Sequence, residues 1–281
     1  MQKIRLASLS MLVVFSLSVT AQQTKIEVQR GQKYQVETST KLSTSADVMG
    51  QTMENNTDSK STTVYEILGA GQDGISLQST IIKMMVNASM MGQSMSYDSD
   101  KKDNEGPIAD VLSPMVNKVK GIILDNNGTI LKQDANENAG QAAMMGAAAS
   151  GNETAIELFI PALIGKELKP GDSFTDAGTV KKEKYSSADS GTYKVTSVEN
   201  GIASISYTGT QVIAMVMEQM GMEMTSNSNN IVKTELQLDT KTGLILAKAT
   251  VVESTVSIDA GGMTIPATGK TVTTITVSPA K

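Results

Sequence analysis

The sequence YQVETSTKL, residues 34–42, alternates between side chains that suit a protein interior and side chains that suit water. Successive side chains of a β-strand point to opposite sides, so alternation of this kind gives a strand one buried face and one wet face. The same period of two recurs at 75–81, 244–252, 256–258 and 273–277. Repeated half-buried strands of this type predict a mainly β protein.

A short glycine element marks four sharp reversals of the chain. The element is Gly-x-x-Met or Gly-x-x-Ile, and it begins at Gly50, Gly92, Gly221 and Gly262. Glycine adopts the positive φ of tight hairpins without a steric penalty. We therefore predict four equivalent hairpin tips, two in each half of the chain. Further turn signals lie at 73–74, 125–128, 200–201 and 241–243.

The strand-like runs fall into two groups, separated by sequence of a different kind. Residues 107–119 carry Pro107 and then apolar side chains at helical spacing, which predicts a helix. Residues 134–154 are rich in Ala, Gly, Asn and Met, and we expect either a short helix at 138–149 or a flexible linker there. The predicted fold is mainly β, with two antiparallel β-sheet halves, as a curved sheet or half-barrel, and a short central helix. The divisions are a first half at 22–133, an Ala/Gly-rich connector at 134–170 and a second half at 171–281.

Residues 1–21 have the character of a cleavable signal peptide. Lys3 and Arg5 precede an apolar stretch, and small side chains precede a cleavage point between Ala21 and Gln22. Gln22 stands where a lipid-anchored protein needs a cysteine. No later apolar run reaches the roughly 18 residues that suggest a membrane-spanning helix. We expect a periplasmic or secreted protein with no transmembrane segment in the mature chain.

Composition narrows the classes of function. The net charge is −5, whereas a nucleic-acid-binding surface needs clustered basic residues, so no nucleic-acid partner is expected. The chain has no histidine and no cysteine, which removes the commonest general base and two common metal ligands. We therefore predict a protein that is not an enzyme and holds no cofactor. An enzyme that works through paired carboxylates is an alternative.

Two glycine-containing motifs resemble nucleotide-binding loops but lack their context. Residues 69–74 read GAGQDG, which matches the dinucleotide fingerprint, and Gly269-Lys270-Thr271 matches the end of a phosphate-binding loop. Both loops need a following helix, because the phosphate sits at the N-terminus of that helix. Period-two sequence follows both motifs here, so we interpret them as parts of strands and turns.

Methionine is the most unusual feature of the composition, with 18 Met against three Phe and no Trp. Methionines can fill an irregular core, form an adaptable apolar surface, or bind Cu(I) or Ag(I) through their thioether sulfurs. All three interpretations are open at this point. The apolar surface would consist of Met49, Met53, Met91, Met95, Met215, Met217, Met222 and Met224. The soft-metal site would use Met90, Met91, Met95, Met220, Met222 and Met224.

A series of short strand-and-turn segments runs along the mature chain. They are GQKY at 31–34, ILDNNG at 123–128, IPA at 160–162, PGDSF at 170–174, YKV at 193–195 and LDTKTG at 238–243. Their order resembles an uncharacterised family of exported β-rich bacterial envelope proteins, a domain of unknown function. That family often has Trp where Phe174 stands, and the resemblance implies no activity, cofactor or catalytic residue. The layout is also loosely similar to the sheets of lipoprotein carriers.

These observations favour a non-enzymatic exported envelope protein that binds an apolar ligand or an envelope protein partner on a Met-rich sheet surface. The alternative is a binder of Cu(I) or Ag(I). The apolar binder requires several Met side chains on one concave face, whereas the metal binder requires converging sulfurs. The carboxylate enzyme requires two carboxylates that face each other in a cleft.

Overall fold

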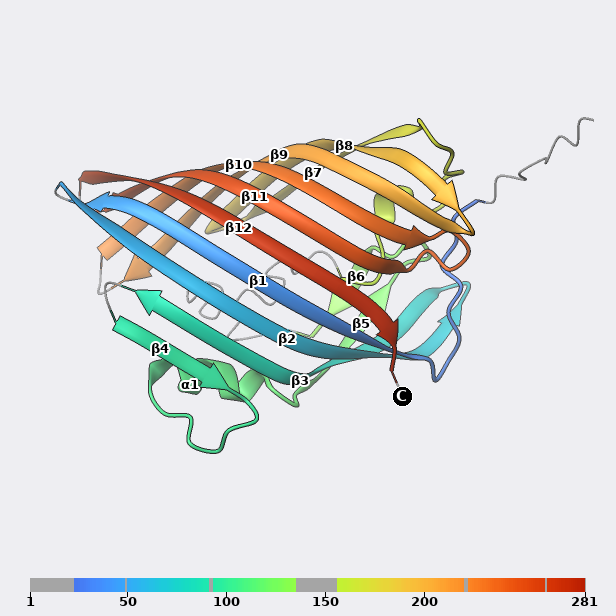
Figure 1. The fold of residues 1–281 in the computed structure, drawn as a ribbon, viewed down its shortest axis with the longest axis horizontal. Helices are drawn as coiled ribbons and strands as arrows, with labels where there is room; N and C mark the ends of the chain where they lie inside the picture. Colours follow the sequence, from blue (N-terminus) through green and yellow to red (C-terminus); the bar gives the residue numbers. More distant parts are fainter. Residues whose placement is uncertain are drawn as a thin grey trace, which may run out of the picture.

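The computed structural model describes residues 23–48, 50–90, 93–134, 156–219, 222–260 and 262–280 (Figure 1). The first half contains β1 (Lys33–Val48), β2 (Gln51–Gly71), β3 (Gly74–Met90), β4 (Gln93–Asp98), α1 (Pro107–Leu112), the 3₁₀ helix η1 (Ser113–Met115), β5 (Val119–Leu124) and β6 (Ile130–Gln133). The second contains the 3₁₀ helix η2 (Pro161–Leu163), β7 (Ser173–Lys182), β8 (Tyr185–Glu199), β9 (Ile202–Gln219), β10 (Met222–Asp239), β11 (Ile245–Ala260) and β12 (Met263–Pro279).

All of these strands belong to one antiparallel sheet that curves without closing (Figure 1). Their order is β6-β5-β3-β2-β1-β12-β11-β10-β9-β8-β7, and β4 lies beside β3. The predicted mainly β, antiparallel fold class is therefore confirmed. The two halves meet where β1 pairs with β12, with Tyr34 opposite Pro279 and Ala46 opposite Ala267. This ladder joins the two ends of the chain, so the halves share a single sheet.

The alternation in residues 34–42 sets the two faces of the sheet as expected. Tyr34, Val36, Thr38 and Thr40 are buried on the concave, inner face, while the residues between them point outward. Across the sheet, the same face holds a row of four threonines, Thr40, Thr273, Thr250 and Thr234, in directly paired positions. Hydroxyl contacts of 3.2 Å (Thr40–Thr273) and 2.9 Å (Thr234–Thr250) link two pairs in this threonine row.

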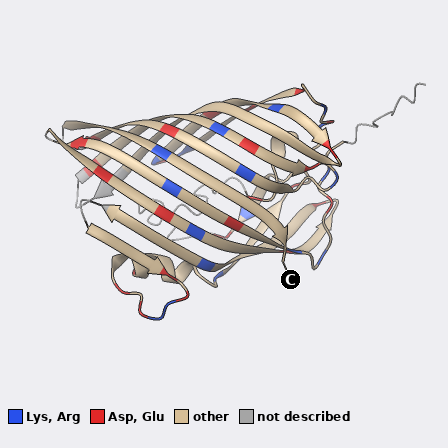
Figure 2. Ribbon diagram, in the orientation of Figure 1, with Lys and Arg blue, Asp and Glu red and all other residues tan. Residues whose placement is uncertain are grey.

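The outer face of the sheet carries charges of both signs along its strands (Figure 2), together with exposed apolar side chains such as Val212 and Ile231. Lys41 lies 4.0 Å from Asp58 on β2, and Lys270 lies 3.8 Å from Glu253 on β11. These exposed cross-strand pairs each contribute at most about 1 kcal/mol to stability. These pairs place charged groups in the middle of the outer face.

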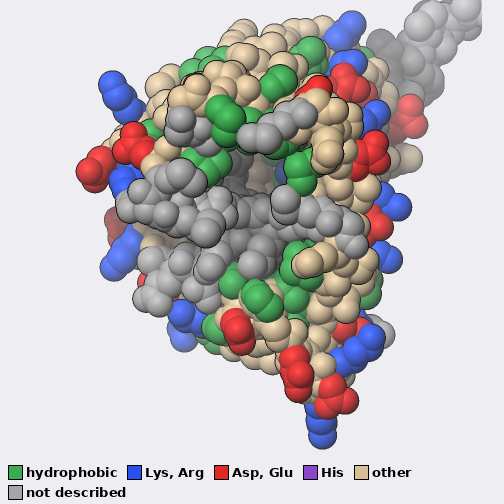
Figure 3. Space-filling model, turned by 90° about the vertical axis from the view of Figure 1, so that its left-hand side faces the viewer, with side chains coloured by type: hydrophobic (Ala, Val, Ile, Leu, Met, Phe, Trp, Pro, Cys, Tyr) green, Lys and Arg blue, Asp and Glu red, His purple; other side chains and the backbone are tan. Residues whose placement is uncertain are grey.

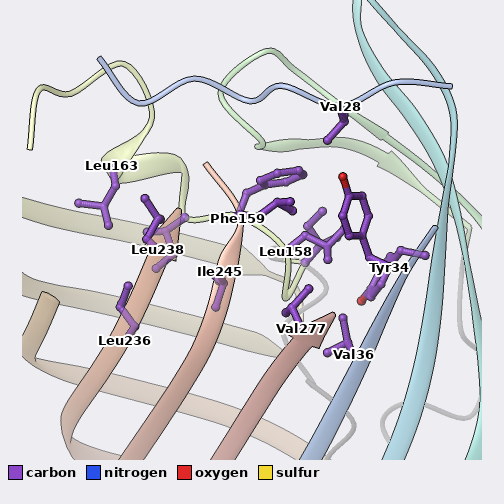
Figure 4. Packing of buried hydrophobic residues seen from close by; sticks show 14 of the residues in the cluster. Val28, Tyr34, Val36, Leu158, Phe159, Leu163, Leu236, Leu238, Ile245 and Val277 are labelled. Atoms are coloured by element: carbon purple, nitrogen blue, oxygen red, sulfur yellow. The ribbon is translucent and has the colours of Figure 1, made fainter. Parts of the chain in front are cut away.

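The main hydrophobic core fills the inner face at one end of the sheet (Figure 4). Val36, Val277, Ile245, Leu236 and Leu238 enter it from neighbouring strands of both halves. The turns at 72–73 and 200–201 lie at this end, and both were expected from the sequence. Asn200 and Gly201 both have positive φ, 51° and 81°, as the tightest hairpin turns require.

A segment outside the sheet completes the main core. Leu158 and Phe159 are 0 % and 2 % exposed and pack against the strand residues in Figure 4. Full burial of each such side chain contributes about 1.5–3 kcal/mol. The predicted connector at 134–170 thus includes a core-forming part, residues 156–168. Residues 135–155, with the helix or linker expected there, lie outside the described residues.

A second core lies on the inner face of β3 and β4, under α1. Met84 and Val86 from β3 meet Ile108 and Leu112 from the helix. The predicted helix at 107–119 was too long, since α1 ends at Leu112, η1 follows and β5 begins at Val119. Pro114 explains the early end, because proline has no N–H for the helical hydrogen bond and clashes with the preceding turn. In the described part of the chain, no helix has the length and apolar character needed to cross a bilayer.

The seam between β1 and β12 can be tested with introduced cysteines, since the chain has none of its own. We expect Thr40→Cys/Thr273→Cys to form a disulfide under mild oxidation, because the two hydroxyls are 3.2 Å apart in directly paired residues. Thr40→Cys/Thr250→Cys is the matched control on the same face. Its positions lie two strands apart, about 10 Å, which is too far to bridge. Equal disulfide yields, measured by mass spectrometry, would show that the halves do not join at this seam.

Candidate functional site

The four glycine elements all lie where strands reverse at one end of the sheet. The hairpins β1–β2, β3–β4, β9–β10 and β11–β12 turn at these elements, which confirms the predicted tips. Gly50 and Gly262 have positive φ, 79° and 87°. Because β1, β3, β9 and β11 run in the same direction in the antiparallel order, their tips share one end, opposite the main core. This hairpin end is at the left in Figure 1 and faces the viewer in Figure 3, where it is hollowed and bordered by hydrophobic side chains.

Apolar side chains continue along the inner face toward the hairpin end, beyond the threonine row. They come from β1, β2 and β9–β12, and each is half-buried. Among the described residues, none of them belongs to either hydrophobic core or packs against one. We call this set the inner apolar surface. Its members are Leu42, Met53, Ile213, Met215, Met224, Val232, Val252, Val256, Ile258 and Ile265.

Three of the predicted surface methionines, Met53, Met215 and Met224, lie in this inner apolar surface. Met95 instead packs against the second core, as the core-filling interpretation expects. Met217 lies opposite Met224 in the β9–β10 register, and Met222 begins β10, but their side chains are outside the described residues. Met49 and Met91 also lie outside the described residues.

The soft-metal alternative needs sulfurs that converge. Of its six residues, Met91 and Met220 lie outside the described residues, and nothing is described of the side chains of Met90 and Met222. Met95 packs against the second core, and Met224 is not among the side chains packed there. Within the described ranges, no three His, Cys, Asp or Glu side chains gather in a way that could hold a metal ion.

A buried carboxylate ties residues 156–168 to the sheet. The hydroxyl of Thr38 donates to Oε2 of Glu157 at 3.2 Å. Burial raises the pKa of Glu157, and the charge of Lys248 and the Thr38 hydrogen bond only partly oppose this. Burial also lowers the pKa of Lys248, although the charge of Glu157 favours its protonated form. The two groups therefore depend on each other to stay charged in the interior.

The inner wall formed by β7, β8 and β9 is polar, and sequence analysis did not single it out. Asp176 and Asp189 lie on adjacent strands of the inner face, as diagonal neighbours. Tyr193 and Tyr207 lie beside them with ring centroids 4.6 Å apart. The only sequence signal is the period of two, which places these residues on one face once the strand register is known.

Two grooves cross the outer face. One has a volume of about 450 Å³ and lies over β12, β1, β2 and β3, where Glu37, Lys60 and Lys83 line it. The other has a volume of about 390 Å³ and lies over β9–β12, where Glu235 and several small residues line it. Among the described residues, Met85 is the one methionine that lines the first groove, and Ala247 and Ala249 line the second beside Glu235. None of the described methionines of the expected apolar surface lines either groove.

The coupling of Glu157 and Lys248 predicts a pH-dependent stability. We expect Lys248→Met to lower the free energy of unfolding at pH 7 by about 1–3 kcal/mol, because Glu157 then stays buried without its cationic neighbour. A carboxyl whose pKa is raised in the native state binds its proton there first, so stability falls as pH rises from its ordinary pKa toward the raised one. The loss should therefore be smaller at pH 5 than at pH 7 in urea unfolding. Glu157→Gln/Lys248→Met, which removes both charges, should recover most of the stability, whereas an equal loss at both pH values contradicts the coupling.

This chain has little similarity to known proteins. No family model matches the chain, and no curated protein matches it. The resemblance to an uncharacterised exported family therefore stays a prediction. Solved structures similar to this chain include the COG4313 outer membrane channel from Pseudomonas putida F1, at 7% identity and a TM-score of 0.21, covering 90% of this chain and 98% of that one. OccK7 (OpdD) of Pseudomonas aeruginosa has 6% identity, a TM-score of 0.28 and coverages of 89% and 99%. OccAB4 of Acinetobacter baumannii has 7% identity, a TM-score of 0.23 and coverages of 90% and 99%.

These comparisons correct one prediction. A periplasmic or secreted location was expected from the leader, yet two of the similar structures are described as outer membrane proteins, the COG4313 channel of Pseudomonas putida F1 and OpdK of Pseudomonas aeruginosa. The periplasmic or secreted location is therefore withdrawn. With TM-scores between 0.20 and 0.28, the likeness itself carries no argument about the fold or the activity of this chain.

Proposed function

We propose that this chain is a non-enzymatic binding protein that holds an apolar ligand on the inner apolar surface of its sheet, near the hairpin end. The observation that carries the proposal is the set of half-buried apolar side chains that continues beyond the threonine row and, in the described part of the chain, joins neither core. Apolar surface that a protein does not bury in its own core is typical of sites for ligands or partners.

The contrast between the two faces supports an inner site. The outer face places Lys41, Asp58, Glu253 and Lys270 along its middle, and the groove over β12 and β1–β3 is lined mostly by charged and hydroxyl side chains, with Met85 among them. An apolar ligand placed there would cover charged groups, which costs free energy. On the inner face, Met53, Met215 and Met224 have flexible, unbranched side chains that can repack around ligands of different shape.

The energetics favour a long ligand over a small one. Burial contributes about 0.8 kcal/mol for each CH₂ group, so a ten-carbon chain gains about 8 kcal/mol before the cost of association. Association costs at least about 4 kcal/mol, so about 4 kcal/mol remains, which corresponds to a dissociation constant of about 1 mM. Each further CH₂ group tightens binding about fourfold. The ligand class that fits is therefore an alkyl chain or an extended apolar segment of a partner protein.

The fluorescent probe N-phenyl-1-naphthylamine provides the test, because its emission rises in apolar sites and the chain has no tryptophan to overlap with it. We expect Met53→Gln/Met215→Gln/Met224→Gln to weaken probe binding about tenfold or more, at roughly 0.5–1 kcal/mol for each substitution. Fluorescence titration measures the dissociation constant.

The matched control substitutes three apolar residues whose side chains point outward. Met85→Gln/Val212→Gln/Ile231→Gln should leave the dissociation constant unchanged, since the side chains of Val212 and Ile231 are exposed on the outer face. Circular dichroism confirms that both variants fold. If the outward variant weakens the probe as much as the inward one, or if neither does, the inner apolar surface is not the binding site.

A further inference from the structure

Two carboxylates and two aromatic rings form a cluster on the inner wall of β7–β9, where the main core ends. Tyr193 packs against the main core, and Tyr207 stacks on Tyr193 at a centroid distance of 4.6 Å and an angle of 42°. Asp176 lies opposite Gly191 in the β7–β8 register, and Asp189 lies two residues before Gly191. The cluster therefore projects from three adjacent strands into the concave side of the sheet.

Two glycines fix the position of the Tyr207 ring. Gly191 and Gly209 are directly paired across β8 and β9, and the ring lies over both of them. A Cβ atom at Gly191 or at Gly209 would clash with the Tyr207 hydroxyl, so a larger residue at either position would displace the ring. Because Gly191 lies opposite Asp176, this arrangement brings the Tyr207 hydroxyl and ring edge to the two carboxylates.

The carboxylates lack a positive partner. Among the described residues, neither Asp176 nor Asp189 forms an ion pair, although ten strands of the same sheet carry Lys on one face or the other. Burial and then the charge of Asp189 raise the pKa of Asp176, and burial and both carboxylates raise the pKa of Tyr207. A cation placed here would relieve the repulsion between the two carboxylates.

We propose that Asp176, Asp189, Tyr193 and Tyr207 bind the ammonium group of an organic cation. Carboxylates supply the opposite charge, and a tyrosine face attracts ammonium through its ring quadrupole. The inner face of β9 continues from Gly209 to Ile213 and Met215 of the inner apolar surface, about 13 Å from Gly209 to Ile213. The inference rests on the proposed function and names its ligand class as a cationic amphiphile, whose chain covers the inner apolar surface while its head group meets the cluster.

Decyltrimethylammonium and decanoate test this ligand class, since they share a chain of similar length and differ in the sign of the head group. We expect isothermal titration calorimetry to show that the wild-type chain binds the cation at least about tenfold more tightly. Asp176→Asn/Asp189→Asn should abolish this preference while binding of decanoate stays the same or improves. Tyr207→Leu should reduce the preference several-fold with both carboxylates in place.

The overall negative charge of the chain could also favour a cation, so the control removes two carboxylates elsewhere. Asp58→Asn/Asp259→Asn makes the same change in net charge on the outer face and should keep the preference. Loss of preference in both double variants, or in neither, overturns the inference. Thermal unfolding monitored by circular dichroism shows that each variant is folded.

Tetramethylammonium separates this inference from the proposed function, because it has no chain to cover the inner apolar surface. Weak binding that disappears in Asp176→Asn/Asp189→Asn supports the cation site even if N-phenyl-1-naphthylamine does not bind. Binding of N-phenyl-1-naphthylamine without any cation preference in the wild-type chain leaves the apolar site in place and refutes the cation site.

Discussion

The whole structure depends on the pairing of the first long strand with the last. From Tyr34 to Ala46, β1 forms a continuous antiparallel ladder with β12, and this ladder joins ends of the chain that are more than 220 residues apart. Without it, the sheet would be two separate halves with two unpaired edges in its middle. With it, Val36 and Val277 can enter one core together with Leu236 and Leu238 from the second half. Long-range pairing of this kind is slow to form but makes the two halves one cooperative structure.

The inner face of this single curved sheet has two different regions. On one side of the threonine row, residues 156–168 bring Leu158 and Phe159 into a well-filled core, with Glu157 held by Thr38. On the other side, toward the hairpin end, the inner face carries half-buried apolar side chains that belong to neither core of the described residues. One end of the sheet therefore provides stability, and the other provides the surface on which the proposed function depends.

Local sequence patterns predicted the elements well, because strands and tight turns are set by neighbouring residues. The alternation at 34–42 and the turn at Asn200-Gly201 are examples, and so are the hairpin tips at Gly50 and Gly262. The apolar spacing at 107–119 predicted a helix that was too long, because spacing alone does not show that Pro114 ends it. The sequence alone could not decide whether the methionines form a metal site or an apolar surface. The two interpretations differ only in whether the methionine sulfurs converge on one point in the folded chain.

What the sequence did not reveal depends on register between distant strands. Asp176 and Asp189 are 13 positions apart, and they become neighbours only through the β7–β8 pairing. Tyr207 reaches them only because Gly191 and Gly209 pair across two strands. A shift of one residue would move any of these side chains to the other face. The apolar run around Leu158 was a readable signal for a core segment, but the Ala/Gly-rich sequence before it led to its assignment to a connector.

Photolabelling tests the central claim most directly. A decyl ammonium probe with a diazirine at the end of its chain would be bound to the folded protein, activated by light and mapped by tandem mass spectrometry. If the inner apolar surface binds the chain of the probe, we expect adducts on inner-face residues near the hairpin end, such as Met53, Met215, Met224 and Ile258. Adducts concentrated on the outward-facing Met85, Val212 and Ile231, or spread evenly over both faces, would contradict it.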